Sequence, residues 1–458
     1  MRAKVVIVGA GPAGMAAAAV LADHGMRPIV LNEHAEPGGQ AWRRASAPVA
    51  PDMRLLLGSE FSKFERAHAG FAALAGRIEY RPNTLAWNVF GDEVFTHAES
   101  RARALRSDAL ILATGATDRM LPVPGWTLPG VYTLGAAQTL LKDQGATIGR
   151  RVAFLGASPL LYLAAAQHRA MGVEVAAVLD STGRGAKVRA LPALVTSGAR
   201  TLARGLGYMA RLRTDGVPLH LGVSDCVIEG EARVTGLRFR TASGQERRVD
   251  CDAVALGFGL RAEIQLAELA GCALRFDPMF RQFLPVTDDD GRAGAGLYLA
   301  GDGATIGGAD AAEISGRLAA FAVLADAGRA VPEAECAALR ASLARLRRFQ
   351  RALGGAFAWP AHWLRDMPAE TALCRCEGVT LGALRDAVGA PLGPAEMNRA
   401  KAITRIGMGR CQGRFCGLAA AEIIAATRGV AVEQAGRLRV QAPVKPIALA
   451  TVLEESAP

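Results

Sequence analysis

A glycine turn near the N-terminus constrains the fold more than any other feature of this sequence. The apolar run Val5 to Val8 leads into GAGPAG (residues 9–14), which is followed by an alanine-rich stretch and a second apolar run ending at Glu33. In such a unit the first glycine allows a tight turn, the second admits a pyrophosphate, and the third lets a helix pack closely on the strand. The order of strand, turn, helix, strand and acid predicts a dinucleotide-binding βαβ unit.

The same pattern occurs a second time without a gap. In RVAFLGASPLLYLAAAQHRAMGVEVAAVLD, Gly156 lies 147 positions after Gly9, and Asp180 lies 147 positions after Glu33. DALILATGA (108–116) is likewise echoed by DAVALGFGL, 144 positions later. The repeat predicts an α/β fold with two related nucleotide-binding units, each with its own return strand.

The second unit has lost two of its three glycines. Ser158 replaces the second glycine and Leu161 replaces the third. The Cβ of Ser158 would crowd a pyrophosphate, although its hydroxyl could donate to a phosphate, and Leu161 would push the helix off the strand. We therefore expect this unit to keep the fold but to bind NAD(P) poorly. Because Asp180 is retained, weak binding of another nucleotide, such as an adenine nucleotide, stays open.

Four of the eight cysteines are clustered near the C-terminus. Cys374 and Cys376 form a C-x-C pair, and Cys411 and Cys416 form a C-x4-C pair after 34 intervening residues. Four thiolates can bind zinc or a [2Fe-2S] cluster. Glycines surround the last two cysteines and free backbone N–H groups for cluster sulfurs, whereas zinc sites more often use C-x2-C pairs. We favour the cluster over zinc and over disulfides, and expect the four scattered cysteines to be buried reduced thiols.

Composition and charge exclude several other classes of protein. The chain has 458 residues and a net charge of +10, but only 5% aromatic residues and no basic run interleaved with them. A diffuse arginine-rich surface is therefore favoured over a nucleic-acid site. Apolar stretches fall short of the roughly 20 residues of a membrane helix. The N-terminus matches a strand and turn better than a signal peptide, so we expect no transmembrane segment and a cytoplasmic location, at most peripheral at the inner membrane through an acceptor.

The first 330 residues resemble flavoprotein reductases with two dinucleotide-binding domains, such as the thioredoxin reductase and nitrite reductase groups. The matching motifs are GGQ at 38–40, ATG at 113–115 and LYLAGDGA at 297–304. The second unit has no CxxC pair, which removes the thioredoxin reductase interpretation. The resemblance implies an FAD site at Gly9, Gly11, Pro12, Ala13, Gly14, Glu33, Gly39, Gln40, Arg43, Thr114, Gly115, Gly301 and Asp302.

Two of these positions rest on weaker grounds than the glycine turn. Gln40, Trp42 and Arg43 follow the GG turn and could approach the flavin or a facing cofactor phosphate. His34 follows Glu33 and is expected to be an exposed loop histidine. No catalytic residue is assigned, because the sequence contains no recognisable set of catalytic acid, base or nucleophile, and electron transfer depends on positioned cofactors instead.

The segment GMGRCQGRFCG resembles the bacterioferritin-associated ferredoxin type of [2Fe-2S] domain. On that match Cys374, Cys376, Cys411 and Cys416 are the metal ligands. Thr380 is expected to cap the helix after the first cysteine pair, and Gly417 to lead into the helix after the second. The aromatic residues between 359 and 363 are expected to pack the connection onto the main body.

The whole chain resembles the FAD-binding subunits of bacterial heteromeric amine dehydrogenases, a group that includes the larger subunits of opine oxidase, hydrogen cyanide synthase (its B subunit) and D-hydroxyproline dehydrogenase (its alpha subunit). The predicted domains are 1–117 (FAD domain, first part), 118–252 (inserted second unit), 253–330 (FAD domain, second part), 331–370 (connection), 371–440 ([2Fe-2S] domain) and 441–458 (tail). The proline-rich tail could lie across a partner surface.

The resemblance implies an electron-transfer role in oxidising a secondary amine, imino acid or amino acid of the opine, D-hydroxyproline or glycine type. Electrons would pass from a partner subunit resembling amino-acid oxidases, through FAD and the [2Fe-2S] cluster, to an acceptor. FMN between the subunits and a small ferredoxin-like subunit are compatible with it. The alternatives are an NAD(P)H-dependent FAD/[2Fe-2S] reductase acting alone and a non-enzymatic metal-handling scaffold.

Overall fold

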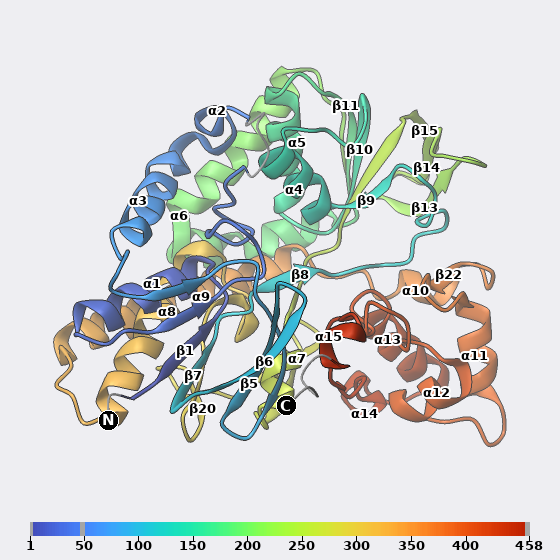
Figure 1. The fold of residues 1–458 in the computed structure, drawn as a ribbon. Helices are drawn as coiled ribbons and strands as arrows, with labels where there is room; N and C mark the ends of the chain where they lie inside the picture. The colour runs from blue at the N-terminus through green and yellow to red at the C-terminus, as the bar shows by residue number, and fades with distance from the viewer. Residues whose placement is uncertain (1–2, 46–50, 454–458) are drawn as a thin grey trace.

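The computed structural model describes residues 3–45 and 51–453, and the two repeats each build one sheet whose central strands are parallel (Figure 1). The four inner strands of the first sheet are buried and mostly Val, Ile and Leu, which is typical of a sheet covered on both faces. The sheet order is β20 (Arg292–Gly294), β21 (Leu297–Leu299), β7 (Ala109–Leu112), β1 (Val5–Val8), β2 (Ile29–Leu31) and β3 (Glu79–Arg81).

Alternate side chains of β1 enter two different cores. Val5 and Ile7 pack against helices α1, α8 and α9, whereas Val6 and Val8 face a three-stranded antiparallel sheet and α7. The bounds are α1 (Pro12–Asp23), α8 (Ala309–Asp326), α9 (Glu333–Ala356), β4 (Leu85–Phe90), β5 (Glu93–Ala98), β6 (Arg101–Arg106) and α7 (Gln265–Leu269).

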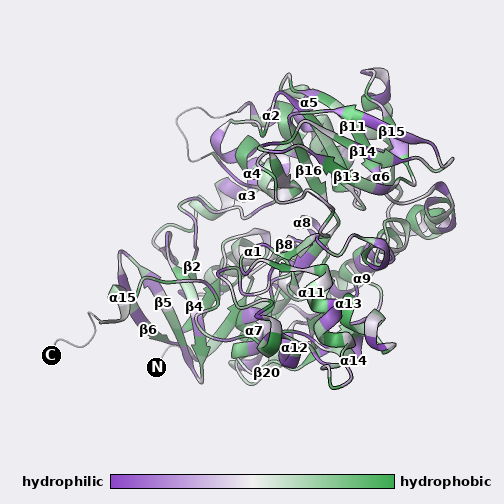
Figure 2. Ribbon diagram, turned by 90° about the vertical axis from the view of Figure 1, so that its right-hand side faces the viewer, coloured by the Kyte–Doolittle hydropathy of each residue, from purple (hydrophilic) through white to green (hydrophobic). Residues whose placement is uncertain are grey.

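The second sheet has hydrophobic side chains on both faces, with helices on one face and a small antiparallel sheet on the other (Figure 2). Its order is β12 (Leu219–Leu221), β11 (Glu174–Asp180), β10 (Arg151–Gly156), β16 (Ala253–Gly257) and β9 (Val131–Thr133). The covering elements are α4 (Leu134–Gln144), α5 (Leu160–Ala170), α6 (Arg184–Thr214), β13 (Ser224–Glu229), β14 (Gly236–Arg240) and β15 (Glu246–Asp250).

The two units repeat one another down to single hydrogen bonds. A carboxylate oxygen of Asp108, just before β7, accepts from the backbone N–H of Lys4 at 2.6 Å. At the equivalent place before β16, Asp252 accepts from the N–H of Arg151 at 2.9 Å. The return strands pair in parallel with β1 and β10 respectively. The prediction of two related α/β units is confirmed.

The predicted domain boundary after residue 252 separates strand β16 from the sheet to which it belongs. The boundary after residue 252 assigned the following residues to the FAD domain, but β16 pairs with β10 and β9 in the second sheet. The physical reason is the repeat itself, because β16 is the return strand of the second unit. We propose that this boundary lies after β16.

Eight further elements of the described chain complete the two units. They are α2 (Met53–Leu57), η1 (Gly58–Glu60), α3 (Phe61–Ala72), β8 (Ala116–Asp118), β17 (Leu260–Ala262), β18 (Leu274–Asp277), β19 (Gln282–Pro285) and η2 (Gly301–Gly303). Most of the predicted connection is the long helix α9, which packs on both α8 and α6. At Gly198, where α6 is broken, an added Cβ would lie 2.5 Å from the ring of Phe349 on α9.

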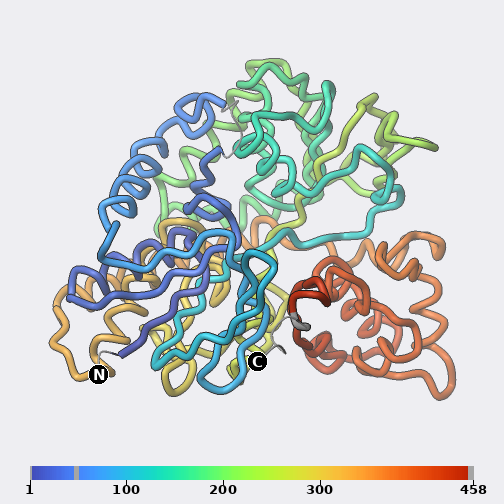
Figure 3. The backbone as a smooth tube through the Cα atoms, viewed as in Figure 1, coloured from blue at the N-terminus to red at the C-terminus, as the bar shows by residue number. Residues whose placement is uncertain are grey.

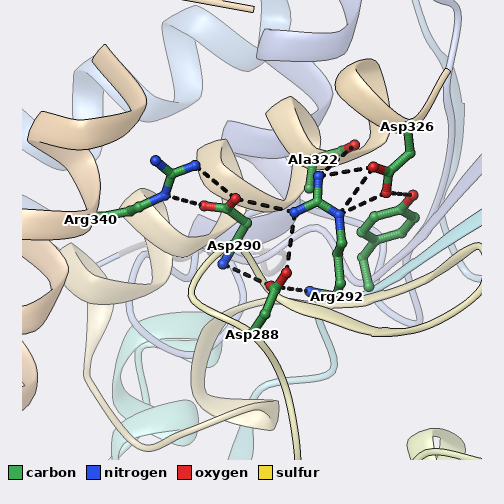
Figure 4. Close-up of polar contacts among 7 residues, drawn as sticks. Asp288, Asp290, Arg292, Ala322, Asp326 and Arg340 are labelled. Carbon is green, nitrogen blue, oxygen red and sulfur yellow. Dashed lines mark hydrogen bonds and ion pairs between the residues drawn. The ribbon is translucent and has the colours of Figure 1, made fainter. Parts of the chain in front are cut away.

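An ion-pair cluster fastens the edge of the first sheet to α8 and α9 (Figure 4). Arg292 on β20 binds Asp326 at the end of α8, with its Nε 2.8 Å from Oδ2. Asp290 accepts from both Nε and Nη2 of Arg340 on α9, at 2.6 and 2.8 Å. The Arg340 guanidinium, ahead of Arg292, holds the pKa of Asp290 below its usual value of 3.8, even though burial opposes this.

The C-terminal part is a small, mainly helical domain. Its elements are α10 (Trp363–Asp366), β22 (Ala372–Cys374), β23 (Val379–Thr380), α11 (Leu381–Gly389), α12 (Met397–Thr404), α13 (Gly417–Arg428) and α14 (Val432–Ala435). The last helix, α15 (Ala450–Leu453), belongs to the tail and packs on β6 instead. The hydroxyl of Thr380 accepts from the N–H of Ala383 at 3.1 Å and caps α11, as predicted. α13 begins at Gly417, also as predicted.

The described part of the tail returns to its own chain (Figure 3). Its predicted docking on a partner stays a prediction. Val444 is buried, and its N–H donates to the carbonyl of Trp87 on β4 at 3.0 Å. Apolar surface on the first sheet's antiparallel layer accounts for this, since Val444 joins that core. Residues 454–458 of the predicted tail lie outside the described residues. Among the helices described, none has the length and apolar character needed to span a membrane.

Candidate functional site

The first glycine turn requires glycine for steric reasons at two points. Gly9 has a φ of +105°, and a Cβ there would lie 2.3 Å from the carbonyl oxygen of Ala113. A Cβ on Gly14 would lie 1.8 Å from the carbonyl oxygen of Gly9. No side chain caps the first N–H groups of α1, which follows Gly11. This leaves an open helix N-terminus against the strand, the arrangement that binds a pyrophosphate.

The other predicted FAD residues converge on this turn from three segments. A Cβ on Gly39 would lie 2.9 Å from the Cα of Gly11, and one on Gly301 would lie 3.0 Å from the Cβ of Ala13. A Cβ on Gly303 would lie 2.6 Å from the hydroxyl of Thr114. The GG turn, the ATG turn and the GDG turn therefore surround the start of α1, and the close backbone packing leaves no room for larger residues.

Asp302 lies beside the start of α8. Its Oδ1 accepts from the N–H groups of Gly307 and Gly308 at 2.8 and 2.9 Å, which fixes the carboxylate. Burial raises the pKa of Asp302, while the two backbone hydrogen bonds act in the opposite direction. Thr114 donates through its hydroxyl to the carbonyl of Glu263 at 2.6 Å, and Gly115 has a φ of +72°. Both turns are thus held by hydrogen bonds of their own.

Glu33 is exposed at the end of β2 and forms an ion pair with Lys445 of the tail. Gln40 is exposed, and its side-chain oxygen accepts from the hydroxyl of Thr139 on α4 at 3.3 Å. The carboxylate of Glu33 therefore faces outward and can exchange its lysine partner for ribose hydroxyls. Sequence reasoning missed Lys445, because it lies 412 residues from its partner and belongs to no motif.

Arg43, predicted to approach the flavin or a facing cofactor phosphate, has internal partners in this structure. Its side chain is buried, with Nη2 3.3 Å from Nε2 of His34 and Nη1 3.6 Å from a carboxylate oxygen of Asp143 on α4. Burial lowers the pKa of Arg43, which Asp143 partly offsets. His34 is exposed, as expected. The observed contacts make Arg43 a link between the loop of the first unit and the second unit.

The helix N-terminus of the second unit is used internally. The hydroxyl of Ser158 accepts from the N–H of Leu160 at 3.2 Å. That N–H belongs to the first turn of α5, where a phosphate would otherwise be bound. Leu161 is fully buried, and the missing side chain of Gly257 on β16 makes room for it, since a Cβ there would lie 3.2 Å from Leu161 Cδ2.

The acid of the second unit is also fully engaged. Asp180 has no exposed surface, whereas its counterpart Glu33 is exposed. One carboxylate oxygen accepts from the hydroxyl of Tyr162 at 2.7 Å and faces the ammonium of Lys187 at 2.8 Å. The other accepts from the N–H and the hydroxyl of Thr182, at 2.8 and 2.5 Å. With four donors inside the protein, this carboxylate has no free position for the hydroxyls of a ribose.

The four clustered cysteines lie together as thiols, without disulfides. Cys374 interacts with Cys416, and Cys376 with Cys411. Hydrogen bonding lowers the pKa of Cys374 to about 5. The largest contribution comes from Cys416, and smaller ones come from the backbone N–H groups of Gly407 and Glu377. Across the described ranges, no group of three or more His, Cys, Asp or Glu side chains already stands in a metal-binding arrangement.

The loops that carry these thiols are packed closely. A Cβ on Gly409 would lie 2.3 Å from the Cβ of Cys376, and Cβ atoms on Gly407 and Gly413 would lie 2.4 and 2.3 Å from Leu438. Four thiol donors with backbone N–H groups directed at a sulfur match the chemistry of a [2Fe-2S] cluster. Cys374 and Cys416 are buried and Cys376 is exposed, so one edge of this group faces solvent.

The aromatic residues of the connection pack as expected. Trp363 is buried and contacts Phe258 edge to face, with the ring centroids 6.1 Å apart. The guanidinium of Arg119 lies 3.9 Å from the ring centroid of Trp359. Arg119 also faces Glu422 of α13, which forms a two-pronged pair with Arg281. These contacts fasten the C-terminal domain to the main body, a role that no motif had indicated.

Comparison with known proteins agrees with this division of the chain. The model of the family described as pyridine nucleotide-disulphide oxidoreductase matches residues 3–323, and that of the BFD-like [2Fe-2S] binding domain matches residues 372–426. The chain is 38% identical to the A subunit of opine oxidase from Agrobacterium tumefaciens (strain Ach5) over 463 residues, covering 97% of this chain and 90% of that protein.

Two further matches span almost the whole chain. Hydrogen cyanide synthase subunit HcnB of Pseudomonas aeruginosa (strain PAO1) is 32% identical over 465 residues, covering 98% of this chain and 97% of that protein. The crystal structure of L-proline dehydrogenase from P. horikoshii is similar in fold, with a TM-score of 0.72 at 20% identity, covering 98% of this chain and 79% of that one.

The cofactors follow from the family and from the fit of the two sites. The body carries the close-packed turn of a flavin dinucleotide site, and the C-terminal domain carries four cysteines in the matched segment. The chain belongs to the pyridine nucleotide-disulphide oxidoreductase family, and it is an FAD-dependent oxidoreductase that carries a [2Fe-2S] cluster in a BFD-like domain.

Proposed function

We propose that this chain is the electron-transfer subunit of a heteromeric dehydrogenase that oxidises a secondary amine, an imino acid or an amino acid. A partner subunit resembling amino-acid oxidases would oxidise the substrate, and this chain would pass the electrons to an acceptor. The full-length relatives support the proposal, because the opine oxidase and hydrogen cyanide synthase proteins that match are by name subunits of larger enzymes.

One observation carries the proposal beyond the family. In a reductase acting alone, the second unit must bind NADH or NADPH, and its acid must accept ribose hydroxyls. Asp180 is instead buried under Tyr162, Lys187 and Thr182, and the hydroxyl of Ser158 accepts from the N–H of Leu160 at the start of α5. Because the acid is fully engaged and one N–H of the helix N-terminus is already bonded, electrons are expected to enter from another protein.

The residues of the first unit would hold FAD. The open N–H groups of α1 after Gly11 would bind the pyrophosphate, and the outward carboxylate of Glu33 would accept from the ribose. By resemblance, Asp302 would hold the ribityl chain. FAD supplies a carrier that accepts an electron pair and releases it one electron at a time. The four cysteines would hold the cluster. Their thiols must lose their protons when it binds.

The test uses the chain purified anaerobically, alone and with the product of an adjacent oxidase-like gene. Flavin, iron and sulfide are measured first, with FAD and FMN separated chromatographically. Flavin bleaching is then followed after adding NADH, NADPH or a panel of secondary amino acids. We expect reduction by an amino acid in the complex only, with about one FAD, two irons and two sulfides in this chain.

Rapid bleaching of the isolated chain by NADH would refute the relay role and support the reductase alternative. A matched variant sharpens this result. Tyr162→Phe removes one donor from Asp180 and leaves the first unit untouched, so it should not alter reduction of the complex by the amino acid.

A further inference from the structure

The cluster domain contacts the flavin body through an arginine that lies between two of the clustered cysteines. Arg414 follows Cys411 by three residues and precedes Cys416 by two. Its Nε lies 2.8 Å from Oε2 of Glu263, and its Nη2 lies 3.1 Å from Oε1. Both side chains are largely buried, with exposed fractions of 12% and 13%. Such a two-pronged pair fixes both distance and orientation.

Each end of this pair reaches one of the two cofactor sites. The N–H of Glu263 donates to the carbonyl of Gly115 at 3.0 Å, and its carbonyl accepts from the hydroxyl of Thr114 at 2.6 Å. On the other side, Nη1 of Arg414 donates to the carbonyl of Val444 at 2.7 Å and, more weakly, to that of Cys411 at 3.4 Å. A continuous set of contacts therefore joins the ATG turn to the Cys411 loop.

The pair also places excess positive charge beside the cluster loop. Arg261 is a second cation on Glu263, with its Nη1 3.3 Å from Oε2. Burial alone would raise the pKa of Glu263, but Arg261 and Arg414 outweigh it and hold the pKa below the usual value. Two cations thus share one carboxylate. Since a four-thiolate cluster becomes more negative when it accepts an electron, nearby positive charge favours its reduced form.

We propose that Glu263 and Arg414 are positioning residues that hold the Cys411 loop against the flavin-side turn and set the reduction potential of the cluster. The inference rests on the assignment of the four cysteines as cluster ligands under the proposed function. It does not depend on the identity of the electron donor or of the partner subunit.

The test compares Glu263→Gln, Arg414→Gln and Arg414→Lys in the full chain reconstituted with FAD and cluster. The cluster is titrated with dithionite and redox mediators and observed by EPR. Removing the carboxylate should raise the potential, and removing the guanidinium should lower it. Each change should alter the ratio of reduced to oxidised cluster at fixed ambient potential by about three- to tenfold, where tenfold equals about 59 mV for one electron. Arg414→Lys keeps the charge and should stay within about twofold of the native ratio.

A second readout separates position from charge. Arg414→Lys loses the two-pronged geometry, so amide hydrogen exchange in residues 411–416 should accelerate in this variant although its potential hardly moves. The control is the interdomain pair of Arg437 with Glu268. Glu268→Gln and Arg437→Gln remove equal charges from the same pair of domains, but neither residue contacts the ATG turn or a cysteine loop carbonyl in the structure.

Shifts of opposite sign for Glu263→Gln and Arg414→Gln, with small shifts in the control pair, are the expected result. Shifts of the same sign, no shift, or equal shifts in the control variants would overturn the proposal. Absence of iron from the native chain after reconstitution would instead refute the proposed function, and that result is known before any variant is titrated.

Discussion

The phenol oxygen of Tyr162 lies 2.7 Å from a carboxylate oxygen of Asp180, a side chain with no exposed surface. In the first unit the corresponding acid, Glu33, is exposed and pairs with a lysine of the tail. Two positions that descend from one repeat therefore serve opposite purposes. The exposed acid is available to a ligand, and the buried one holds its own domain together.

Replacing Asp180 with Ala should destabilise the second unit. The change leaves the ammonium of Lys187 without its carboxylate partner, and the hydroxyls of Tyr162 and Thr182 without their acceptor. Because Lys187 retains some exposure, we expect a loss of about 2–3 kcal/mol, less than for a fully buried pair. Urea unfolding followed by circular dichroism would measure it. Tyr162→Phe, which removes one hydrogen bond, should cost about 1 kcal/mol, and an equal loss in both variants would contradict the network.

Gly14→Ala should weaken FAD binding, because the new Cβ would lie 1.8 Å from the carbonyl oxygen of Gly9. An overpacking cost of about 1–3 kcal/mol, taken up by the FAD-bound state, corresponds to binding weaker by about 5- to 150-fold. The measurement is flavin absorbance per chain, followed by titration of the apoprotein with FAD. Gly70→Ala is the matched control, since it lies in α3 with no atom within 4 Å of its new Cβ. Normal flavin content in Gly14→Ala would show that the turn is not the binding site.

Glu422→Gln should loosen the C-terminal domain. It removes the charge that faces Arg119 and Arg281, and Arg119 is so deeply buried that its pKa falls to about 9. Unpaired buried charge costs about 3 kcal/mol or more. Limited proteolysis should therefore cut the connection at 357–371 faster in this variant. Glu433→Gln, on the exposed surface of α14, should behave like the native protein, and similar cleavage of both variants would refute the role of Glu422.

The ion-pair cluster at the sheet edge should contribute stability that depends on pH. The pKa of Asp290 is lowered from 3.8, so the native state favours the charged carboxylate more than the unfolded chain does. Its contribution is fully present above about pH 5 and is lost as the pH falls through 3.8 and then through the lowered value.

This pH dependence can be measured with Asp290→Asn. The variant should be about 1 kcal/mol less stable at neutral pH, a modest value because Arg340 is partly exposed. The difference between the two proteins should shrink below about pH 4. Any loss of cofactor in acid affects both proteins, so only the difference between their free energies of unfolding is informative. A difference that does not change with pH would contradict the role given to the Asp290 carboxylate.

Local features of the site could be predicted from the sequence, because they depend on neighbouring residues. The requirement for glycine at Gly14 follows from one turn of helix meeting one strand, and its steric basis is visible in the structure. The cap at Thr380 and the start of α13 at Gly417 also follow from a few adjacent residues. In each case the interacting atoms belong to residues that are close neighbours along the chain.

Contacts between distant segments could not be predicted in this way. Glu263 and Arg414 are 151 residues apart, and no single motif contains both. Arg43 was expected to approach the flavin or a facing cofactor phosphate because it follows the GG turn, and its contact with Asp143 on another element could not be predicted. The hydrogen bond that Ser158 accepts from the N–H of Leu160 was likewise not predicted, and it leaves the serine O–H free to donate. The repeat predicts the fold of each unit. It does not predict the partners of polar side chains, because these depend on how the units pack against each other.

The internal partners of Asp180 have a metabolic consequence. A flavoprotein with an open nicotinamide pocket exchanges electrons with the whole cellular store of NADH and NADPH, whatever its intended substrate. Here a tyrosine, a lysine and a threonine occupy the carboxylate, and a serine occupies the helix end. No single substitution can reopen both positions. Under the proposed function, these contacts would keep NADH and NADPH from reducing the flavin directly, and the redox centres would receive electrons only from the partner subunit.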